Sequence, residues 1–187
     1  MAETLRIAGV VKESIVDGKG LRFVVFCQGC PHHCPGCHNP QTHDFEGGYD
    51  IDIQKIVEEV KKNPLLQGVT FSGGEPFCQA GAFAALGKAL KDIRGMHLNL
   101  TAYTGYTYEE LLKRAEEDTG VGELLKVCDY LIDGPFILDQ RDLSLKYRGS
   151  RNQRYIDLNR SRVKKQVVLA QEDETLRPRE LYQGRHL

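Results

Sequence analysis

Four of the six cysteines in this sequence fall within eleven residues of one another, and thiolates are the side chains here best suited to bind a metal. They are Cys27, Cys30, Cys34 and Cys37. Thiolates bind zinc and iron–sulfur clusters. Such clustering in an intracellular chain favours metal or redox chemistry over a disulfide framework. The isolated Cys78 and Cys128 are interpreted as small hydrophobes.

Two ligand sets can be drawn from these cysteines. All four would form a compressed zinc-binding module, although structural zinc sites usually place more residues between their cysteine pairs. A four-thiolate electron carrier of the ferredoxin type is a further reading. The spacing Cys30-x3-Cys34-x2-Cys37 resembles the signature loop of radical S-adenosylmethionine enzymes. That resemblance implies a [4Fe–4S] cluster with one iron open to a substrate, and it leaves Cys27 as a small hydrophobe at a strand end.

A glycine-rich turn, Ser72-Gly73-Gly74-Glu75-Pro76, follows a predicted strand and precedes a predicted helix. Glycines at such a connection often serve only to turn the chain. The segment also resembles the GGEP motif of the same enzymes. The resemblance implies that the backbone and the Glu75 carboxylate hold the α-amino group of S-adenosylmethionine, because an ammonium group needs such acceptors.

Further segments, spread from about residue 6 to residue 158, resemble one family within these enzymes. Asp17–Arg22 resembles the DGxGxR element of glycyl-radical-enzyme activases. Later segments resemble the anaerobic ribonucleoside-triphosphate reductase activating proteins; they are Tyr103–Leu111, Asp133–Phe136, Asp142–Leu145 and Arg148–Arg154. Pyruvate formate-lyase activases share the cysteine loop and the Ser-Gly-Gly-Glu turn but lack the later segments, and they remain the alternative. Two residues depart from the pattern: Gly36 stands where an aromatic residue is common, and Lys19 stands where proline is usual.

The resemblance implies that the chain cleaves S-adenosylmethionine and makes a glycyl radical on the large reductase subunit. It implies a flavodoxin-type electron donor, and it leaves a homodimer open. The chemistry would belong to the cluster and the cofactor, with no separate catalytic residue. The implied metal ligands are Cys30, Cys34 and Cys37. The implied cofactor-binding residues are Ser72, Gly73, Gly74, Glu75, His38, Asn39, Thr104 and Asp133. The residues implied to dock the partner are Asp17, Arg22, Arg148 and Arg151.

Some of these residues also have a purely structural interpretation. Asp133 precedes Gly134-Pro135 and is equally suited to start a turn. Arg148, Arg151 and Arg154 would suit a solvated strand edge. His32 and His33 are expected on the loop surface, because three cysteines suffice as ligands.

The elements that position these residues alternate between strands and helices. Apolar patterns predict strands at 23–26, 68–71, 97–102, 127–132, 154–158 and 165–169, and helices at 51–62, 80–93 and 108–117. This α/β alternation predicts βαβ units and a parallel sheet, with the functional loops at the carboxyl ends of its strands. The resemblance implies a partial (βα)6-like radical SAM barrel, a mostly parallel curved sheet that leaves one side open.

The 187 residues suit one domain, expected at 1–170 and followed by a polar tail at 171–187. The formal net charge of −1 provides no electrostatic reason to expect nucleic acid or an anionic membrane as partner. No apolar stretch is long enough to span a bilayer. The first residues lack the apolar core of a signal peptide, so a cytoplasmic protein is expected.

Overall fold

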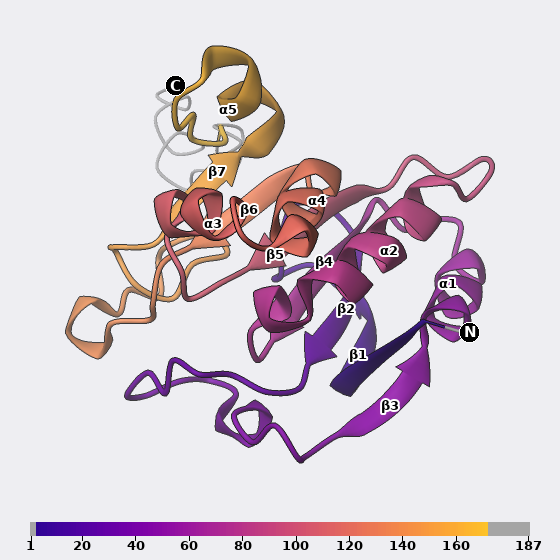
Figure 1. The fold of residues 1–187 in the computed structure, drawn as a ribbon, viewed down its shortest axis with the longest axis horizontal. Coiled ribbons are helices and arrows are strands. Elements are labelled where there is room, and N and C mark those ends of the chain that lie inside the picture. Colours follow the sequence, from indigo (N-terminus) through magenta and orange to yellow (C-terminus); the bar gives the residue numbers. More distant parts are fainter. Residues whose placement is uncertain (1–2, 172–187) are drawn as a thin grey trace, which may run out of the picture.

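The computed structural model describes residues 3–171, and in this part of the chain seven strands form one mixed sheet in the order β3-β1-β2-β4-β5-β6-β7 (Figure 1). The strands are β1 (Thr4–Ser14), β2 (Arg22–Cys27), β3 (Tyr49–Asp52), β4 (Gly68–Gly73), β5 (Asn99–Tyr103), β6 (Tyr130–Asp133) and β7 (Arg154–Asp157). The α/β class is therefore confirmed.

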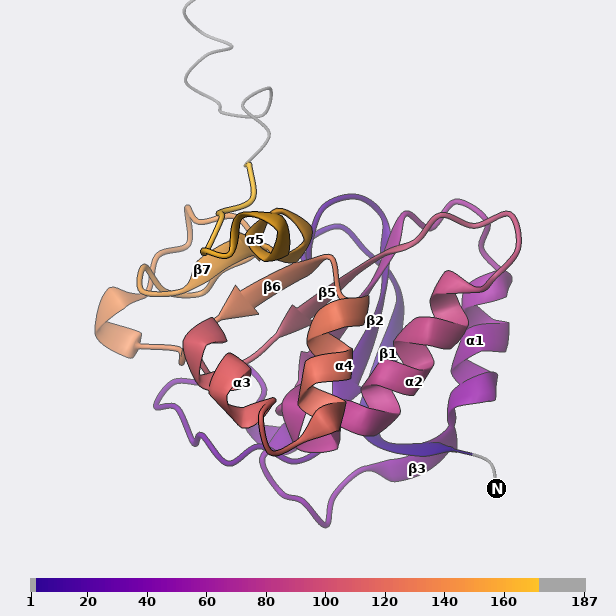
Figure 2. The same cartoon turned by 45° about the horizontal axis from the view of Figure 1, so that its top comes forward.

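The helices are α1 (Ile53–Lys61), α2 (Ala80–Lys91), α3 (Tyr108–Arg114), α4 (Thr119–Val127) and α5 (Leu158–Lys164). Several begin at side chains that accept backbone N–H groups, as helix N-termini require. Thr107 and Glu110 form a capping box at the start of α3, and Asp118 caps α4. Figure 2 shows α1, α2 and α4 side by side over one face of the sheet.

Four neighbouring strands, β2, β4, β5 and β6, run parallel. The edges are antiparallel: β1 joins β2 in a hairpin and pairs with β3, and β7 returns beside β6. Among the described residues β3 and β7 are the two edges of the sheet, which is therefore not closed. The sheet thus has seven strands where about six were predicted, and four of them are parallel because the chain reverses direction at both edges.

Three local predictions were wrong or incomplete. The segment 165–169 is not a full strand: Lys165 takes a left-handed conformation with φ of 52° after α5, and Leu169 forms an isolated antiparallel bridge with Ile156 of β7. The predicted helix at 51–62 starts at Ile53, since Tyr49–Asp52 pairs with β1. The helix α4 and the antiparallel strands β1 and β3 were not predicted.

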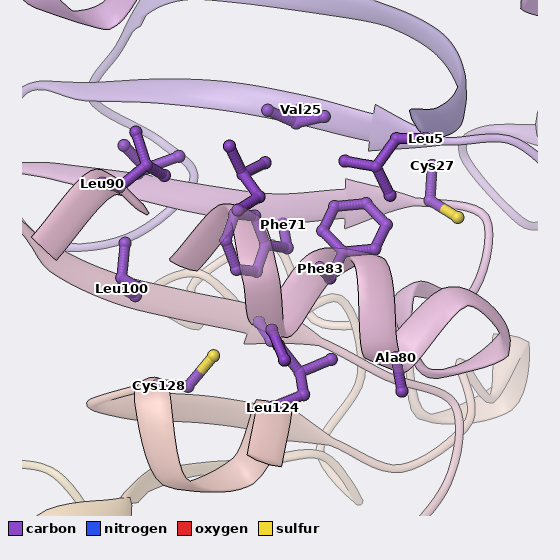
Figure 3. Close-up of a cluster of buried hydrophobic side chains, with 14 of the residues drawn as sticks. Leu5, Val25, Cys27, Phe71, Ala80, Phe83, Leu90, Leu100, Leu124 and Cys128 are labelled. Atoms are coloured by element: carbon purple, nitrogen blue, oxygen red, sulfur yellow. The ribbon is translucent and has the colours of Figure 1, made fainter. Parts of the chain in front are cut away.

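The core lies between the sheet and its helices, and two cysteines belong to it. Figure 3 shows Cys27 and Cys128 among the apolar side chains of this cluster, with Phe71 and Phe83 at a ring separation of 4.9 Å. Burial raises the pKa of both thiols to about 12. Cys27 and Cys128 are therefore small buried hydrophobes, as predicted. Cys78 is exposed, so the same interpretation was wrong for it.

Side chains of β2 alternate between the two faces of the sheet. Phe23, Val25 and Cys27 belong to the helix-side core, whereas Arg22 bonds to side chains on the other face. Its guanidinium donates to Thr70 Oγ1 at 2.6 Å, Asn99 Oδ1 at 2.6 Å and Thr101 Oγ1 at 3.0 Å. Arg22 is 0% exposed. Its predicted role in docking a partner is therefore wrong, and it ties together the beginnings of β2, β4 and β5.

None of the helices within residues 3–171 combines the length and the apolar character needed to cross a membrane. The predicted tail lies outside the described residues except for Gln171.

Replacing Arg22 with methionine is expected to lower the free energy of unfolding by about 3 kcal/mol, because several buried acceptors lose their donor. Urea denaturation measures this change. The matched control is Arg151→Met at an exposed position, which should stay within about 0.5 kcal/mol of the wild type. Equal effects of the two substitutions would contradict the structural role of Arg22.

Candidate functional site

A cleft of about 530 Å³ lies on the face of the sheet away from the helices, at the carboxyl ends of the parallel strands. Phe26, Ser72, Gly73 and Tyr103 of β2, β4 and β5 line it. The other lining residues come from loops: Val16, Asp17, Cys37, His38, Asn39, Phe136, Asp142, Leu143, Leu145, Tyr147, Arg148, Gly149 and Gln153. The predicted convergence of loops at one rim is confirmed for the cysteine loop and the glycine-rich turn.

The cysteine loop follows β2 directly and is held by the segment after it. The Gly29 N–H donates to the Thr42 carbonyl at 2.7 Å, and the Cys30 N–H donates to the His43 carbonyl at 3.2 Å. The Gln28 side chain donates to the Asp44 carbonyl at 2.6 Å. The beginning of the loop therefore has a defined backbone path before the later cysteines are reached.

The three predicted ligands differ in their surroundings. Cys30 is 9% exposed, and burial raises the pKa of its thiol. Cys34 and Cys37 are partly exposed, and the Cys37 side chain lines the cleft. Backbone N–H groups favour two of the thiolates: that of Asn39 donates to Cys37 Sγ at 3.4 Å, and that of His32 acts to lower the pKa of the Cys30 thiol against the larger effect of burial. Such N–H donors stabilise thiolates, the form that binds iron.

Within residues 3–171, no three His, Cys, Asp or Glu side chains converge as a site for a single metal ion. Three thiolates that each bind a different iron of one cluster do not have to converge on one point. The donor set, three cysteines with backbone N–H groups that favour two of the thiolates, fits an iron–sulfur cluster.

The glycine-rich turn packs backbone against backbone on the cysteine loop. The Gly74 N–H donates to the Cys27 carbonyl at 2.8 Å, and the Glu75 N–H donates to the Gly29 carbonyl at 2.8 Å. A Cβ atom on Gly74 would lie 2.2 Å from the Gly29 oxygen. Glycine is therefore required here for close approach of the two loops.

The Glu75 carboxylate is 0% exposed and accepts hydrogen bonds from the protein itself. Its Oε2 accepts from His32 Nε2 at 2.7 Å, Thr104 Oγ1 at 3.0 Å and the Gly105 N–H at 2.8 Å, while Oε1 accepts from the Phe77 N–H at 3.0 Å. The predicted contact of this carboxylate with an ammonium group is therefore wrong for this conformation. Thr104, 5% exposed, likewise bonds to Glu75 and not to a group in the cleft.

The Asp133 carboxylate also accepts hydrogen bonds from other groups of the protein. It is 1% exposed, and its Oδ2 accepts from the Tyr108 N–H at 2.8 Å and from Arg154 Nη2 at 2.5 Å. The Arg154 guanidinium bridges it to Glu109, and these two carboxylates raise the pKa of Arg154. The Asp133 carboxylate therefore joins β6, β7 and the start of α3, a structural role different from the turn start considered from the sequence.

The remaining predicted residues divide between the cleft and the outer surface. Ser72, Gly73, His38 and Asn39 line the cleft, as do Asp17 and Arg148 from the predicted docking set. The His38 ring lies 5.3 Å from that of Phe136. Arg151 is exposed and is not among the described lining residues of the cleft.

Sequence reasoning missed several residues of the site. His32 is 16% exposed and pairs with Glu75, so its placement on the loop surface was wrong, whereas His33 is exposed as expected. Tyr103 ends a parallel strand, a position that could have marked it. Phe136 and Tyr147 reach the cleft through a long loop; Phe136 lies in the segment Asp133–Phe136 noted above, whereas no local pattern marks Tyr147.

Replacing Gly74 with alanine is expected to separate the glycine-rich turn from the cysteine loop and to lower the melting temperature by several degrees. Thermal unfolding followed by circular dichroism measures this. The matched control is Gly81→Ala near the start of α2, where an added Cβ meets nothing within 4 Å and alanine favours the helix. A Gly74→Ala protein as stable as the control would contradict the close packing of the two loops.

Comparison with known proteins agrees with this arrangement. A family model described as a 4Fe-4S single cluster domain matches residues 16–156. The chain is 34% identical over 144 residues to an anaerobic ribonucleoside-triphosphate reductase-activating protein of Haemophilus influenzae, covering 74% of this chain and 89% of that protein. The protein of that name from Pasteurella multocida is 36% identical over 145 residues, with the same shares covered. A pyruvate formate-lyase-activating enzyme of Clostridium pasteurianum is 37% identical over 118 residues, 59% of this chain and 49% of that protein. The chain thus belongs to the family of anaerobic ribonucleoside-triphosphate reductase-activating proteins.

Proposed function

We propose that this chain reductively cleaves S-adenosylmethionine at a [4Fe–4S] cluster and makes the glycyl radical of the large subunit of an anaerobic ribonucleoside-triphosphate reductase. The observation that carries the proposal is the placement of the cysteine loop: Cys37, His38 and Asn39 line a cleft at the carboxyl ends of parallel strands. The names and the coverage of the relatives support the same activity.

The proposed ligands of the cluster are Cys30, Cys34 and Cys37. When bound, the cluster would supply the electron that splits the cofactor into methionine and a 5′-deoxyadenosyl radical. The backbone N–H groups of His32 and Asn39 stabilise two of the thiolates. Hydrogen bonds to cluster sulfurs also adjust the reduction potential.

The cofactor would bind in the cleft next to Cys37. Ser72 and Gly73 offer backbone and hydroxyl groups to its polar end, and His38 and Asn39 lie on the same lining. His38 and Phe136 offer aromatic rings 5.3 Å apart, which suit the apolar and ring parts of the cofactor.

The reductase would approach the same cleft. Asp17 and Arg148 lie on its lining and are proposed to contact the partner, with exposed Arg151 farther out. The open, twisted sheet is proposed to be the partial barrel of the radical SAM enzymes. A flavodoxin-type electron donor, a homodimer and a cytoplasmic location remain part of the proposal.

The buried position of Cys27 favours this function over a four-cysteine zinc module. Cys27 is 0% exposed and belongs to the core on the helix side of the sheet. Its Sγ accepts from Gln79 Nε2 at 3.1 Å. Phe26, its neighbour on β2, faces the cleft instead, as alternation along a strand requires.

Anaerobic reconstitution with iron and sulfide is expected to give about four irons per chain and dithionite-dependent formation of 5′-deoxyadenosine. Cys30→Ala, Cys34→Ala and Cys37→Ala should each abolish cofactor cleavage, because each removes a ligand. Cys27→Ala is the matched control and should retain most of the activity. A colourless protein with one zinc, or equal loss in the Cys27 variant, would overturn the three-ligand assignment.

Adding each candidate partner to the reduced, reconstituted protein distinguishes the reductase from pyruvate formate-lyase. With S-adenosylmethionine present, electron paramagnetic resonance should detect a glycyl radical on the large reductase subunit. The coverage of about half of the Clostridium pasteurianum enzyme favours the reductase over the lyase. A radical on pyruvate formate-lyase alone would establish the alternative activity.

A further inference from the structure

His32 lies between Cys30 and Cys34, and its ring fills a slot built from the turn after β5. The ring stands edge-on to that of Tyr106, with centroids 4.5 Å apart. A Cβ atom on Gly105 would lie 2.4 Å from the His32 ring, so this slot exists only because residue 105 is glycine. The Arg114 guanidinium lies 4.5 Å from the Tyr106 ring centroid and holds that ring in turn.

The floor of the slot is the buried Glu75 carboxylate. His32 Nε2 donates to Glu75 Oε2 at 2.7 Å, beside the Thr104 hydroxyl and the Gly105 N–H on the same oxygen. These donors come from the cysteine loop after β2 and from the turn after β5, while Glu75 itself belongs to the turn after β4. One carboxylate therefore joins three loops.

The ring position also bears on the neighbouring thiol. His32 follows Cys30 by two residues, so holding the side chain of His32 also restrains the backbone next to this thiol. Replacing a residue that orients a metal ligand commonly lowers metal affinity about 10-fold to 100-fold.

We propose that His32 is a positioning residue for the iron–sulfur cluster. Through its hydrogen bond to Glu75, it holds the Cys30–Cys34 segment against the turns that end β4 and β5. The inference rests on the proposed function, because it takes Cys30 and Cys34 as ligands. It deepens that function by placing the support of the cluster in a side chain that is not itself a ligand.

Three variants of the full-length, reconstituted protein separate this role from simple packing. His32→Phe keeps a ring beside Tyr106 but removes the donor, and His32→Gln places an amide donor near the position of Nε2. His33→Asn is the matched control in the same loop, because His33 is exposed and its left-handed φ of 48° suits asparagine. The melting temperature of each cluster-free variant shows that the fold is retained.

Two readouts do not depend on turnover: the rate of iron loss to a chelator under anaerobic conditions, and the reduction potential of the cluster. His32→Phe is expected to lose iron about 10-fold faster than the wild type and to show a shifted potential. His32→Gln should recover most of both properties, and His33→Asn should match the wild type. In the cluster-free protein, the Cys30 amide should exchange its hydrogen faster in His32→Phe.

The possible failures are distinct. A wild-type chain that takes up no cluster overturns the proposed function itself. A wild-type chain that takes up the cluster, with His32→Phe equal to it in iron retention, potential and amide exchange, overturns the positioning role alone. Equal losses in His32→Phe and His32→Gln would also overturn it, because the hydrogen bond would then not be the cause.

Discussion

A carboxylate removed from water needs donors, and Glu75 finds its donors in the loops that follow adjacent parallel strands. The arrangement of the site depends on these hydrogen bonds to Glu75. The glycine-rich turn can supply the carboxylate only because Gly74 lets its backbone contact the Gly29 carbonyl of the cysteine loop. The turn after β5 completes the set through Thr104 and Gly105. The three loops thus form one unit, and the cleft opens beside it.

One face of the sheet packs on the helices and the other lines the cleft. Successive side chains of β2 point alternately to these two faces. Cys27 points to the helix-side core, while Phe26 faces the cleft. On this second face Arg22 binds the beginnings of the strands together, at the end away from the cysteine loop. Polar groups therefore hold the sheet together at both ends: a buried cation where the strands begin, and a buried anion where they end.

The long connection between β6 and β7 contributes many of the residues that line the cleft. Asp133 and Arg154 hold its two ends together through their ion pair. Between them the chain contributes Phe136, Leu143, Tyr147 and other residues to the cleft lining. The motifs after Asp133 that resemble the reductase-activating proteins lie in this connection.

The sequence by itself determined the family, the α/β class, the cysteine loop and most of the parallel strands, because these depend on local spacing and apolar patterns. It also predicted that Cys27 is a small hydrophobe at a strand end, and the structure buries it in the core. Tertiary structure decided what the polar side chains do. Glu75, Thr104, Asp133 and Arg22 each matched a motif for binding, yet each is buried and satisfied by partners far away in the sequence. His32, in contrast, was expected on the loop surface, yet its side chain pairs with Glu75, which lies 43 residues away in the sequence. Hydrogen bonds over such separations depend on which strands become neighbours, and no local pattern records that.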